Sequence, residues 1–277
     1  MKVELITATC QWEANRVNRL TLENAFNHFT GHIDIVELHV PYTKYEYVFK
    51  MMAKTRKLKG KKVLILAGDS LNLDMLSRFY QRSDDRSKPS DEWRDLVIVM
   101  REAKRTYDKI IMEQTNHDSR IYKCIRDNIL GRDRDDEIQE WLRTYQEAFE
   151  REGIENIMVI KGAIFQVGQI IITHFENNSI VPGNIPRDVI KYLVPRIQKP
   201  WSIVFQAHTH TQSKIPNDRK ICIETGALCK TLDYWRRGRM QGKGKLTSLG
   251  YAVCDMKDGI PDPNESNFVF CEWEDYI

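Results

Sequence analysis

Short apolar runs that end abruptly in polar residues recur along the 277-residue chain, and they limit the folds that it can adopt. Five of these runs are rich in β-branched residues and have the length of buried strands. They cover residues 33–38, 63–67, 109–112, 170–173 and 202–206. Stretches with helical periodicity lie between them, at residues 44–58, 91–107, 135–151 and 186–198. Strands that alternate with helices predict an α/β or layered α+β fold.

The remaining segments indicate how the chain is organised around this alternation. Three more strands are expected in the C-terminal stretch, where Gly, Pro and Asn turns favour a meander that closes a second sheet. They cover residues 221–224, 249–255 and 267–273. We expect an N-terminal extension (1–31), a main domain (32–277) and a charged helical lobe (119–151). Ser90 is the expected N-cap of the second helix, and Pro186 lies in the first turn of the fourth.

Composition excludes several classes of protein. Apolar residues make up 42% of the chain and charged residues 29%, which excludes a disordered, collagenous or coiled-coil protein. No apolar run approaches the roughly 18 residues of a membrane span, and the start of the chain lacks the basic-then-apolar layout of a signal peptide. The six cysteines include no CxxC pair, which favours reduced thiols. We therefore expect a soluble cytoplasmic protein that does not bind a membrane.

Two basic segments stand out against a net charge of only +3. Residues 54–62 are rich in Lys, and we interpret them as a solvated surface. The second segment contains Trp235, Arg236, Arg237 and Arg239. Aromatic rings beside cations are a common means of holding single-stranded nucleic acid, so these four residues are candidate substrate contacts.

The residues that follow the five strands carry the chemistry. In an open α/β sheet the carboxyl ends of the strands line the ligand crevice, so side chains far apart in the sequence converge there. The strand ends present Glu37 and His39, Asp69, Asn116 with His117 and Asp118, His174, and His208 with His210. Oxygen and nitrogen ligands without a thiolate suit Mn, Fe, Zn or Ni. Each motif alone is more often ordinary polar surface, but five in order, each at a strand end, indicate a metal centre.

The order and spacing of these residues resemble the calcineurin-like metallophosphoesterase superfamily, whose motifs are D-x-H, GDxxD, GNHD, a lone His and GHxH. The local match is closest to phage and bacterial members, in which the first motif continues as HxPY and the second as a GD…SRF stretch. The matching stretches here are residues 37–42, 68–79, 116–120 and 224–228. With the alternation of strands and helices, the resemblance implies a four-layer α-β-β-α sandwich of two mixed sheets flanked by helices.

The resemblance also implies a role for each residue. Two divalent metal ions would be bound, most of all Mn²⁺, with Fe, Zn, Ni or Mg as alternatives. The ligands of the first ion would be Glu37, His39 and His210, and those of the second Asn116, His174 and His208, with Asp69 bridging the two. His117 would stabilise or protonate the leaving oxygen, Asp118 would orient its ring, and Arg120 would contact the phosphate. The implied reaction is hydrolysis of a phosphate ester by a hydroxide held between the ions.

Four positions depart from the family pattern. Glu37 stands where the family has Asp, and its extra methylene moves the carboxylate by about 1.5 Å. We expect either a compensating rotamer or backbone shift or a weaker first metal site. Asn72 takes the second acidic position of GDxxD, where we expect a modest effect. Thr115 and Ala207 replace glycines, and they would be strained if their positions require a positive φ.

Three functions are compatible with these observations. The first is a metal-dependent phosphodiesterase that acts on DNA or another nucleotide-containing ester, which the second basic segment favours. The second is a phosphomonoesterase, such as a protein phosphatase. The third is a non-catalytic binding protein whose first metal site has decayed through Glu37. The sequence leaves the oligomeric state open.

Overall fold

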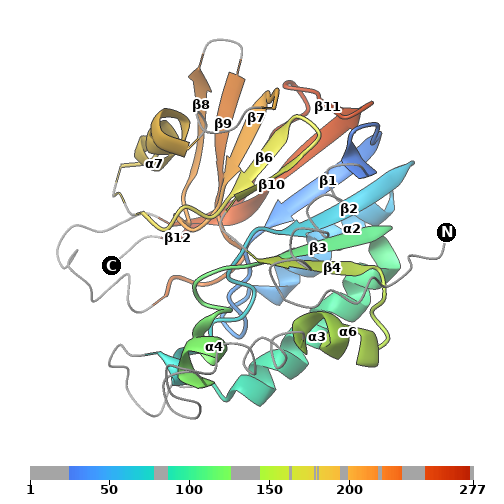
Figure 1. Cartoon of the computed structure of the whole chain (residues 1–277), viewed down its shortest axis with the longest axis vertical. Coiled ribbons are helices and arrows are strands. Elements are labelled where there is room, and N and C mark those ends of the chain that lie inside the picture. Colours follow the sequence, from blue (N-terminus) through green and yellow to red (C-terminus); the bar gives the residue numbers. More distant parts are fainter. Residues whose placement is uncertain are drawn as a thin grey trace.

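Two mixed β-sheets pack face to face at the centre of the molecule, with helices on both outer faces (Figure 1). The computed structural model describes residues 25–77, 87–125, 144–161, 164–177, 179, 181–193, 199–217, 220–232 and 247–274. Every structural statement below refers to these residues.

The first sheet has the strand order β11-β10-β1-β2-β3-β4, and β12 also pairs with β10. Its parallel strands are β1 (Gly31–Val36), β2 (Lys61–Leu66), β3 (Lys109–Gln114) and β4 (Ile157–Lys161). Its antiparallel strands are β10 (Thr247–Lys257), β11 (Ile260–Pro261) and β12 (Asn267–Glu274). The carboxyl ends of β1, β2 and β3 therefore share one edge of this sheet.

The second sheet has the order β5-β6-β7-β9-β8. Three strands run parallel in its middle: β6 (Ile170–Thr173), β7 (Ile203–Gln206) and β9 (Lys220–Thr225). The edge strands β5 (Ile164–Val167) and β8 (Gln212–Asn217) are antiparallel to their neighbours. The carboxyl ends of β6 and β7 thus also lie side by side.

The helices complete the layers. They are α2 (Tyr45–Arg56), α3 (Pro89–Thr106), α4 (Arg120–Ile125), α6 (Thr144–Arg151) and α7 (Asn184–Asp188), with a 3₁₀ turn η1 (Asp74–Leu76) and a π-helical stretch η4 (Val189–Leu193). In Figure 1, α3 and α6 lie below the first sheet and α7 lies against the outer face of the second.

Three apolar clusters separate the four layers. Leu64 of β2 packs with the residues of α3 and α6, whereas its neighbour Ile65 points into the cluster between the sheets. Val204 of β7 packs toward α7, and Phe205 points into the same central cluster as Ile65. Because successive side chains of a strand point to opposite faces, each central strand is buried on both sides. The predicted four-layer sandwich of two mixed sheets is confirmed.

Two sequence expectations about local structure are wrong. Of the three predicted C-terminal strands, only 221–224 lies in the second sheet, as β9, because β10 pairs with β1 and carries β11 and β12 into the first. This strand is buried on both faces, with Tyr251 in one apolar cluster and Ala252 in another. Ser90 is not an N-cap, because α3 begins at Pro89 after Lys88. Proline suits the first helical position, since it lacks the N–H that would go unpaired there.

Some expectations lie wholly or partly outside the described residues. These include most of the 1–31 extension and the middle of the 119–151 lobe. The division into domains stays a prediction. Of the lobe, α6 packs into the main core through Tyr145 and Phe149. Among the described helices, none combines the length and the apolar character needed to cross a membrane.

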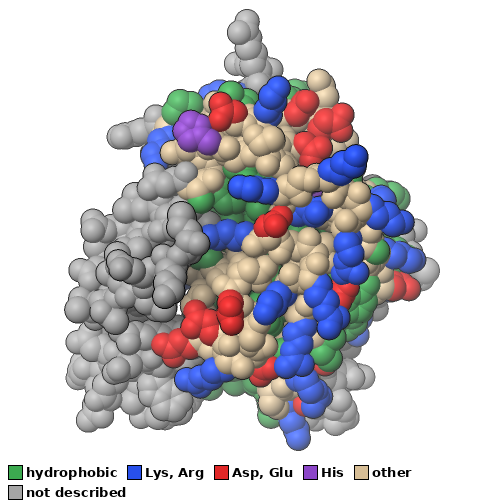
Figure 2. Space-filling view, turned by 90° about the vertical axis from the view of Figure 1, so that its right-hand side faces the viewer, with side chains coloured by type: hydrophobic (Ala, Val, Ile, Leu, Met, Phe, Trp, Pro, Cys, Tyr) green, Lys and Arg blue, Asp and Glu red, His purple; other side chains and the backbone are tan. Residues whose placement is uncertain are grey.

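The basic segment 54–62 lies at the end of the first sheet opposite to its carboxyl edge. It connects the last turn of α2 to the start of β2, and Lys54, Lys57, Lys59 and Lys61 are exposed. Figure 2 shows many Lys and Arg side chains gathered on one face of the molecule. A six-residue strand such as β2 spans about 20 Å, so the lysines of the segment 54–62, at its start, lie far from the polar residues that follow its end.

A buried carboxylate fastens the two outer helices to β1. Asp34 of β1 accepts hydrogen bonds from the hydroxyls of Thr55 in α2 and Tyr107 after α3, each at 2.6 Å. The Nε2 atom of His32 lies 3.2 Å from Asp34, and its Nδ1 contacts Asp255 at 2.5 Å. Burial of His32 opposes its charge, but hydrogen bonds and attraction from these carboxylates raise its pKa.

We expect Tyr107→Phe to lower the free energy of unfolding by about 1.5–3 kcal/mol, because Asp34 loses a hydrogen-bond donor while its carboxylate stays buried. Urea unfolding followed by circular dichroism measures this change. Tyr45→Phe is the matched control, since its hydroxyl lies 3.5 Å from Asp95 and its ring is half-buried. Equal stability of the two variants would contradict the role given to Asp34.

Candidate metal centre

The polar residues predicted as ligands converge where the carboxyl edges of the two sheets meet. The first sheet supplies Glu37 and His39 after β1, Asp69 after β2, and Asn116 and His117 after β3. The second sheet supplies His174 after β6, and His208 and His210 after β7. Three groups of side chains come close enough to hold an ion: Glu37, His39 and His210; Asp69, His174 and His208; and His39, Asp69 and His117.

The backbone at this edge turns sharply, and four of the converging residues adopt a positive φ. They are His39 (53°), Asp69 (41°), His208 (74°) and His210 (51°). Such a conformation costs about 1–2 kcal/mol for a residue with a side chain. Hydrogen bonds at the turns offset part of this cost, such as the one from the His39 amide to the carbonyl of Asp69 at 2.8 Å.

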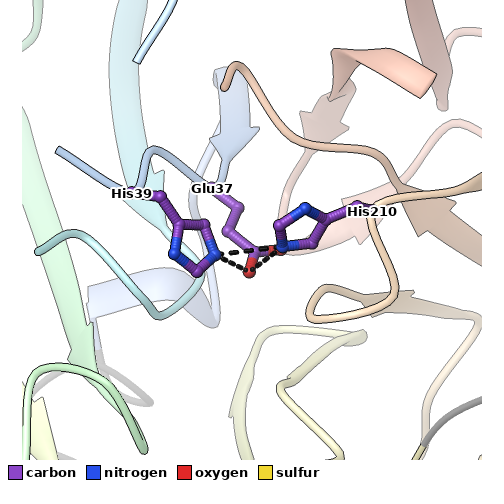
Figure 3. Close-up of side chains that lie close together, drawn as sticks. All are labelled: Glu37, His39 and His210. Carbon is purple, nitrogen blue, oxygen red and sulfur yellow. Dashed lines mark hydrogen bonds and ion pairs between the residues drawn. The ribbon is translucent and has the colours of Figure 1, made fainter. Parts of the chain in front are cut away.

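Glu37, His39 and His210 point their ligand atoms at one another, as Figure 3 shows. The Oε1 atom of Glu37 lies 3.0 Å from Nε2 of His39 and 3.3 Å from Nε2 of His210, and the two nitrogens are 3.0 Å apart. Ligands that bind one ion at about 2.0–2.2 Å, with angles between 90° and 109°, are separated by about 3.0–3.5 Å. The three atoms therefore fit a single divalent ion.

The second group is built around Asp69 and His174. The Nε2 atom of His174 lies 3.2 Å from Oδ2 of Asp69 and 3.1 Å from Nδ1 of His208. The Nδ1 atom of His174 lies 3.0 Å from the carbonyl of Ala67, so it donates there and leaves the Nε2 lone pair facing the cluster. A lone pair that faces a carboxylate and another imidazole requires a proton or a cation between them.

The side-chain amide of Asn116 completes this group. Its oxygen lies 3.2 Å from Nε2 of His174 and 3.1 and 3.3 Å from the two oxygens of Asp69. An amide oxygen suits this position only where a cation or the His174 proton lies among these atoms. Without a cation, the opposite orientation would let the amide nitrogen donate to the same atoms.

Burial and charge set the protonation states of these groups. Burial opposes the ionisation of Glu37 and Asp69, but the neighbouring imidazoles hold the pKa of each carboxyl well below its usual range. Burial and repulsion from His174 lower the pKa of His208 to about 3. Burial also disfavours charge on His174 itself, yet attraction to Asp69 raises its pKa to about 10. Ionised carboxylates around imidazoles favour the entry of a divalent cation, which would displace the proton from His174.

Glu37 is longer than the Asp of the family pattern, and the structure uses that length. While Oε1 faces the two imidazoles, Oε2 accepts a hydrogen bond from the backbone amide of His208 at 2.8 Å. The side chain thus reaches from the first sheet to the second. That this reach compensates for the longer side chain stays a prediction.

The expected strain at Thr115 and Ala207 is absent, because neither has a positive φ. The hydroxyl of Thr115 instead holds Asp69: it accepts from the Asp69 amide at 2.8 Å and donates to its Oδ1 at 2.6 Å. The turn after β2, which carries Asp69, requires a glycine at position 68. The φ of Gly68 is 96°, and a Cβ there would lie 2.4 Å from Nδ1 of His174. Sequence reasoning missed Thr115 because it compared the residue with a glycine.

His117 and Arg120 form a pair beside Asp69. The Nε2 atom of His117 lies 3.2 Å from Nη2 of Arg120 and 3.9 Å from Oδ2 of Asp69, and its Nδ1 lies 3.2 Å from the carbonyl of Asn72. Burial is the main reason that the pKa of His117 is lowered well below its usual range. The neutral ring donates from Nδ1 and accepts from Arg120, which is also paired with Asp74 at 3.0 Å.

Asp118 does not face the ring of His117, which corrects its expected role. Its carboxylate accepts from the backbone amides of Leu71 at 2.9 Å and of Ser70 and Thr115 at 3.4 Å. Burial, with repulsion from Asp69, raises the pKa of Asp118 to about 7. Asp118 therefore anchors the loop after β2, and the carbonyl of Asn72 takes the place expected for it beside His117.

Glu92 anchors the same loop and was missed by the sequence analysis. From the first turn of α3, its Oε2 accepts from the amides of Asn72 at 3.1 Å and Leu73 at 2.7 Å. Glu92 and Asp118 together receive four successive amides, those of residues 70–73. A Glu in the first turn of a helix is usually exposed, so no local signal distinguished this one.

The predicted contacts Trp235, Arg236, Arg237 and Arg239 lie outside the described residues. Their role stays a prediction.

No family model and no curated protein matches this chain. Solved structures that resemble it include a novel archaeal phosphodiesterase (14% identity, 87% of this chain and 99% of the other, TM-score 0.40). A hypothetical protein from Pyrococcus horikoshii gives 11% identity, 88% of each chain and a TM-score of 0.47. Vps29 of Entamoeba histolytica complexed with Zn²⁺ gives 7% identity, 88% of this chain and 99% of the other, and a TM-score of 0.39. These values do not assign the chain to a family.

Glu92 predicts a pH dependence of stability. Burial raises its pKa from the ordinary 4.5 to about 8, so between these values the folded chain binds more protons than the unfolded one. The free energy of unfolding therefore falls as the pH rises toward 8. Between pH 5 and 8.5, Glu92→Gln should lose less stability than the wild type, by on the order of 2 kcal/mol in urea unfolding.

The matched control is Glu152→Gln, a surface carboxylate paired with Arg101. Its pH profile should run parallel to that of the wild type. A parallel profile for Glu92→Gln would contradict the proton that we assign to Glu92.

Glu37→Asp should lower metal affinity rather than repair the site. The shorter side chain withdraws the carboxylate by about 1.5 Å from both imidazoles and from the His208 amide, against a ligand tolerance of about 0.2 Å. Calorimetric titration with Mn²⁺ should show one binding step weakened at least about tenfold. Stronger binding by the variant would show instead that Glu37 is the defect of a decayed site.

Proposed function

We propose that this protein is a metal-dependent phosphoesterase. The observation that carries the proposal is the place of Asp69, whose Oδ2 lies 3.2 Å from Nε2 of His174 in one group of ligand atoms and 3.7 Å from Nε2 of His39 in the other. A carboxylate shared by two sets of ligand atoms suits a pair of ions. Bound there, two divalent ions supply an activated water and the positive charge that displacement at phosphorus needs.

The proposed first site comprises Glu37, His39 and His210, and the proposed second site comprises Asn116, His174 and His208, with Asp69 between them. The chemistry of these donors supports Mn²⁺, and Fe or Zn would fit the same set. The distances from Glu37 to His39 and His210 support a working first site over a non-catalytic protein.

Arg120 and His117 are the proposed contacts to the ester. Arginine keeps its charge at every physiological pH, and its planar guanidinium matches two phosphate oxygens. The neutral His117 ring accepts from Arg120 and so helps to hold the guanidinium in place. Protonation of a leaving oxygen by His117 would first require this contact to break.

We further propose that the substrate is a phosphodiester, with a nucleic acid or nucleotide as the leading class. The support is the segment with Trp235, Arg236, Arg237 and Arg239, whose rings and cations suit a nucleotide strand. A phosphomonoester is the alternative that the same metal chemistry would serve.

Hydrolysis of bis-(p-nitrophenyl) phosphate and of p-nitrophenyl phosphate, each with Mn²⁺ or with EDTA, tests the proposal. We expect Mn²⁺-dependent cleavage with a preference for the diester, and a loss of at least about a hundredfold in Asp69→Asn. The control is Asp108→Asn, an exposed carboxylate that accepts from the Lys62 amide. Preference for the monoester would select the alternative substrate, and no turnover of either ester would refute the enzyme.

A further inference from the structure

Asn72 contacts both the candidate metal ligands and the pair that faces the ester, although it is neither. It is fully buried in the loop that follows β2. Its side-chain oxygen lies 3.2 Å from Nδ1 of His39. Its backbone oxygen lies 3.2 Å from Nδ1 of His117 and 2.5 Å from Nη1 of Arg120.

The side-chain contact decides which nitrogen of His39 can bind an ion. An oxygen opposite Nδ1 accepts a proton from it, so the neutral ring carries its lone pair on Nε2. That nitrogen is the one that faces Glu37 at 3.0 Å and His210 at 3.0 Å. The opposite tautomer would place a proton where the ion must lie.

The loop holds Asn72 too firmly for this contact to be incidental. The backbone N–H of Asn72 donates to the carbonyl of Val40 at 2.9 Å and to Oε2 of Glu92 at 3.1 Å. The next amide, that of Leu73, donates to Glu92 at 2.7 Å. Because Val40 directly follows His39, the same bonds fix the ring and the residue that orients it.

The side chain of Asn72 is uncharged, and this also keeps the local charge low. The loop that carries Asn72 already holds two carboxyl side chains, those of Asp69 and Asp74. An Asp at position 72 would offer His39 the same acceptor but add a further buried negative charge. Asn supplies the hydrogen bond without that charge.

We propose that Asn72 is a positioning residue, whose side-chain oxygen fixes the metal-binding nitrogen of His39 while its backbone oxygen orients His117 and Arg120. This proposal rests on the proposed function for the identity of the bound group, but its contacts are independent of any turnover. One residue thereby sets the geometry of the first candidate site and of the ester contacts together.

Calorimetric titration of the metal-free protein with Zn²⁺ tests the side-chain role. Asn72→Ala should weaken one of two binding steps by about 10- to 100-fold and leave the other unchanged, because the acceptor for Nδ1 is gone. Asn72→Asp should restore that step to within about threefold of the wild type, since it keeps the acceptor. Wild-type affinity in Asn72→Ala, or an equal loss in both variants, would overturn the proposal.

Nitrogen-15 NMR of the imidazoles in the metal-free protein, above the pKa of His39, provides the second readout. In the wild type, His39 and His117 should both carry their proton on Nδ1. In Asn72→Ala only His39 should change, because the backbone oxygen that holds His117 remains. A change at His117 alone, or no change at His39, would overturn the assignment.

Asn156→Ala is the matched control. It removes a different Asn side-chain hydrogen bond, from Nδ2 of Asn156 to the carbonyl of Tyr107 at 2.8 Å, which lies away from the candidate ligands. This variant should leave both Zn²⁺ binding steps unchanged. Thermal melting of every variant separates a folding defect from a binding defect. If the wild type binds two Zn²⁺ ions yet hydrolyses no ester, the proposed function fails while these outcomes still decide the role of Asn72.

Discussion

Glu37 joins the two β-sheets through one buried carboxylate, and the geometry of the site depends on it. One oxygen faces His39 of the first sheet and His210 of the second, and the other accepts the His208 amide. Its backbone carbonyl also receives the amide of Leu228 at 2.8 Å. A buried carboxylate is stable only when its oxygens are paired, so the two edges must stay in register for the cost of burial to be met. The ligand atoms of both sheets are placed by that requirement.

Around this link, the site combines strained turns with firmly held loops. The positive φ values at His39, Asp69, His208 and His210 aim their side chains inward at a cost in backbone energy. The surrounding hydrogen bonds sustain that cost, above all the four successive loop amides received by Asp118 and Glu92. Ligand side chains that are already held in place lose little conformational freedom when an ion binds, so the rigidity of these turns favours metal affinity.

The role of a residue that departs from the family pattern depends on the contacts that its side chain makes in the structure. Thr115 and Asn72 are substitutions when compared with the motif, yet in the structure one holds Asp69 and the other holds His39. Glu92 belongs to no motif, and it anchors the loop that both of them serve. Such residues act through hydrogen bonds between segments far apart in the chain. Sequence reasoning can propose metal ligands because metal chemistry restricts their types, whereas many residue types can supply a supporting hydrogen bond.

The sequence by itself predicted alternating strands and helices, because apolar runs of strand length must be buried, and its resemblance to a known family implied the four-layer sandwich. It also predicted that the imidazoles and carboxylates at the strand ends meet, because the carboxyl ends of parallel strands share one edge of a sheet. It could not place β10, which pairs with β1 in the first sheet and is buried there against apolar side chains on both faces. It also could not assign Asp118, because two of the three amides that donate to its carboxylate lie in the loop after β2. Only the tertiary structure decided that Asp118 holds a loop rather than an imidazole, because a buried carboxylate pairs with whichever donors the packing brings to it.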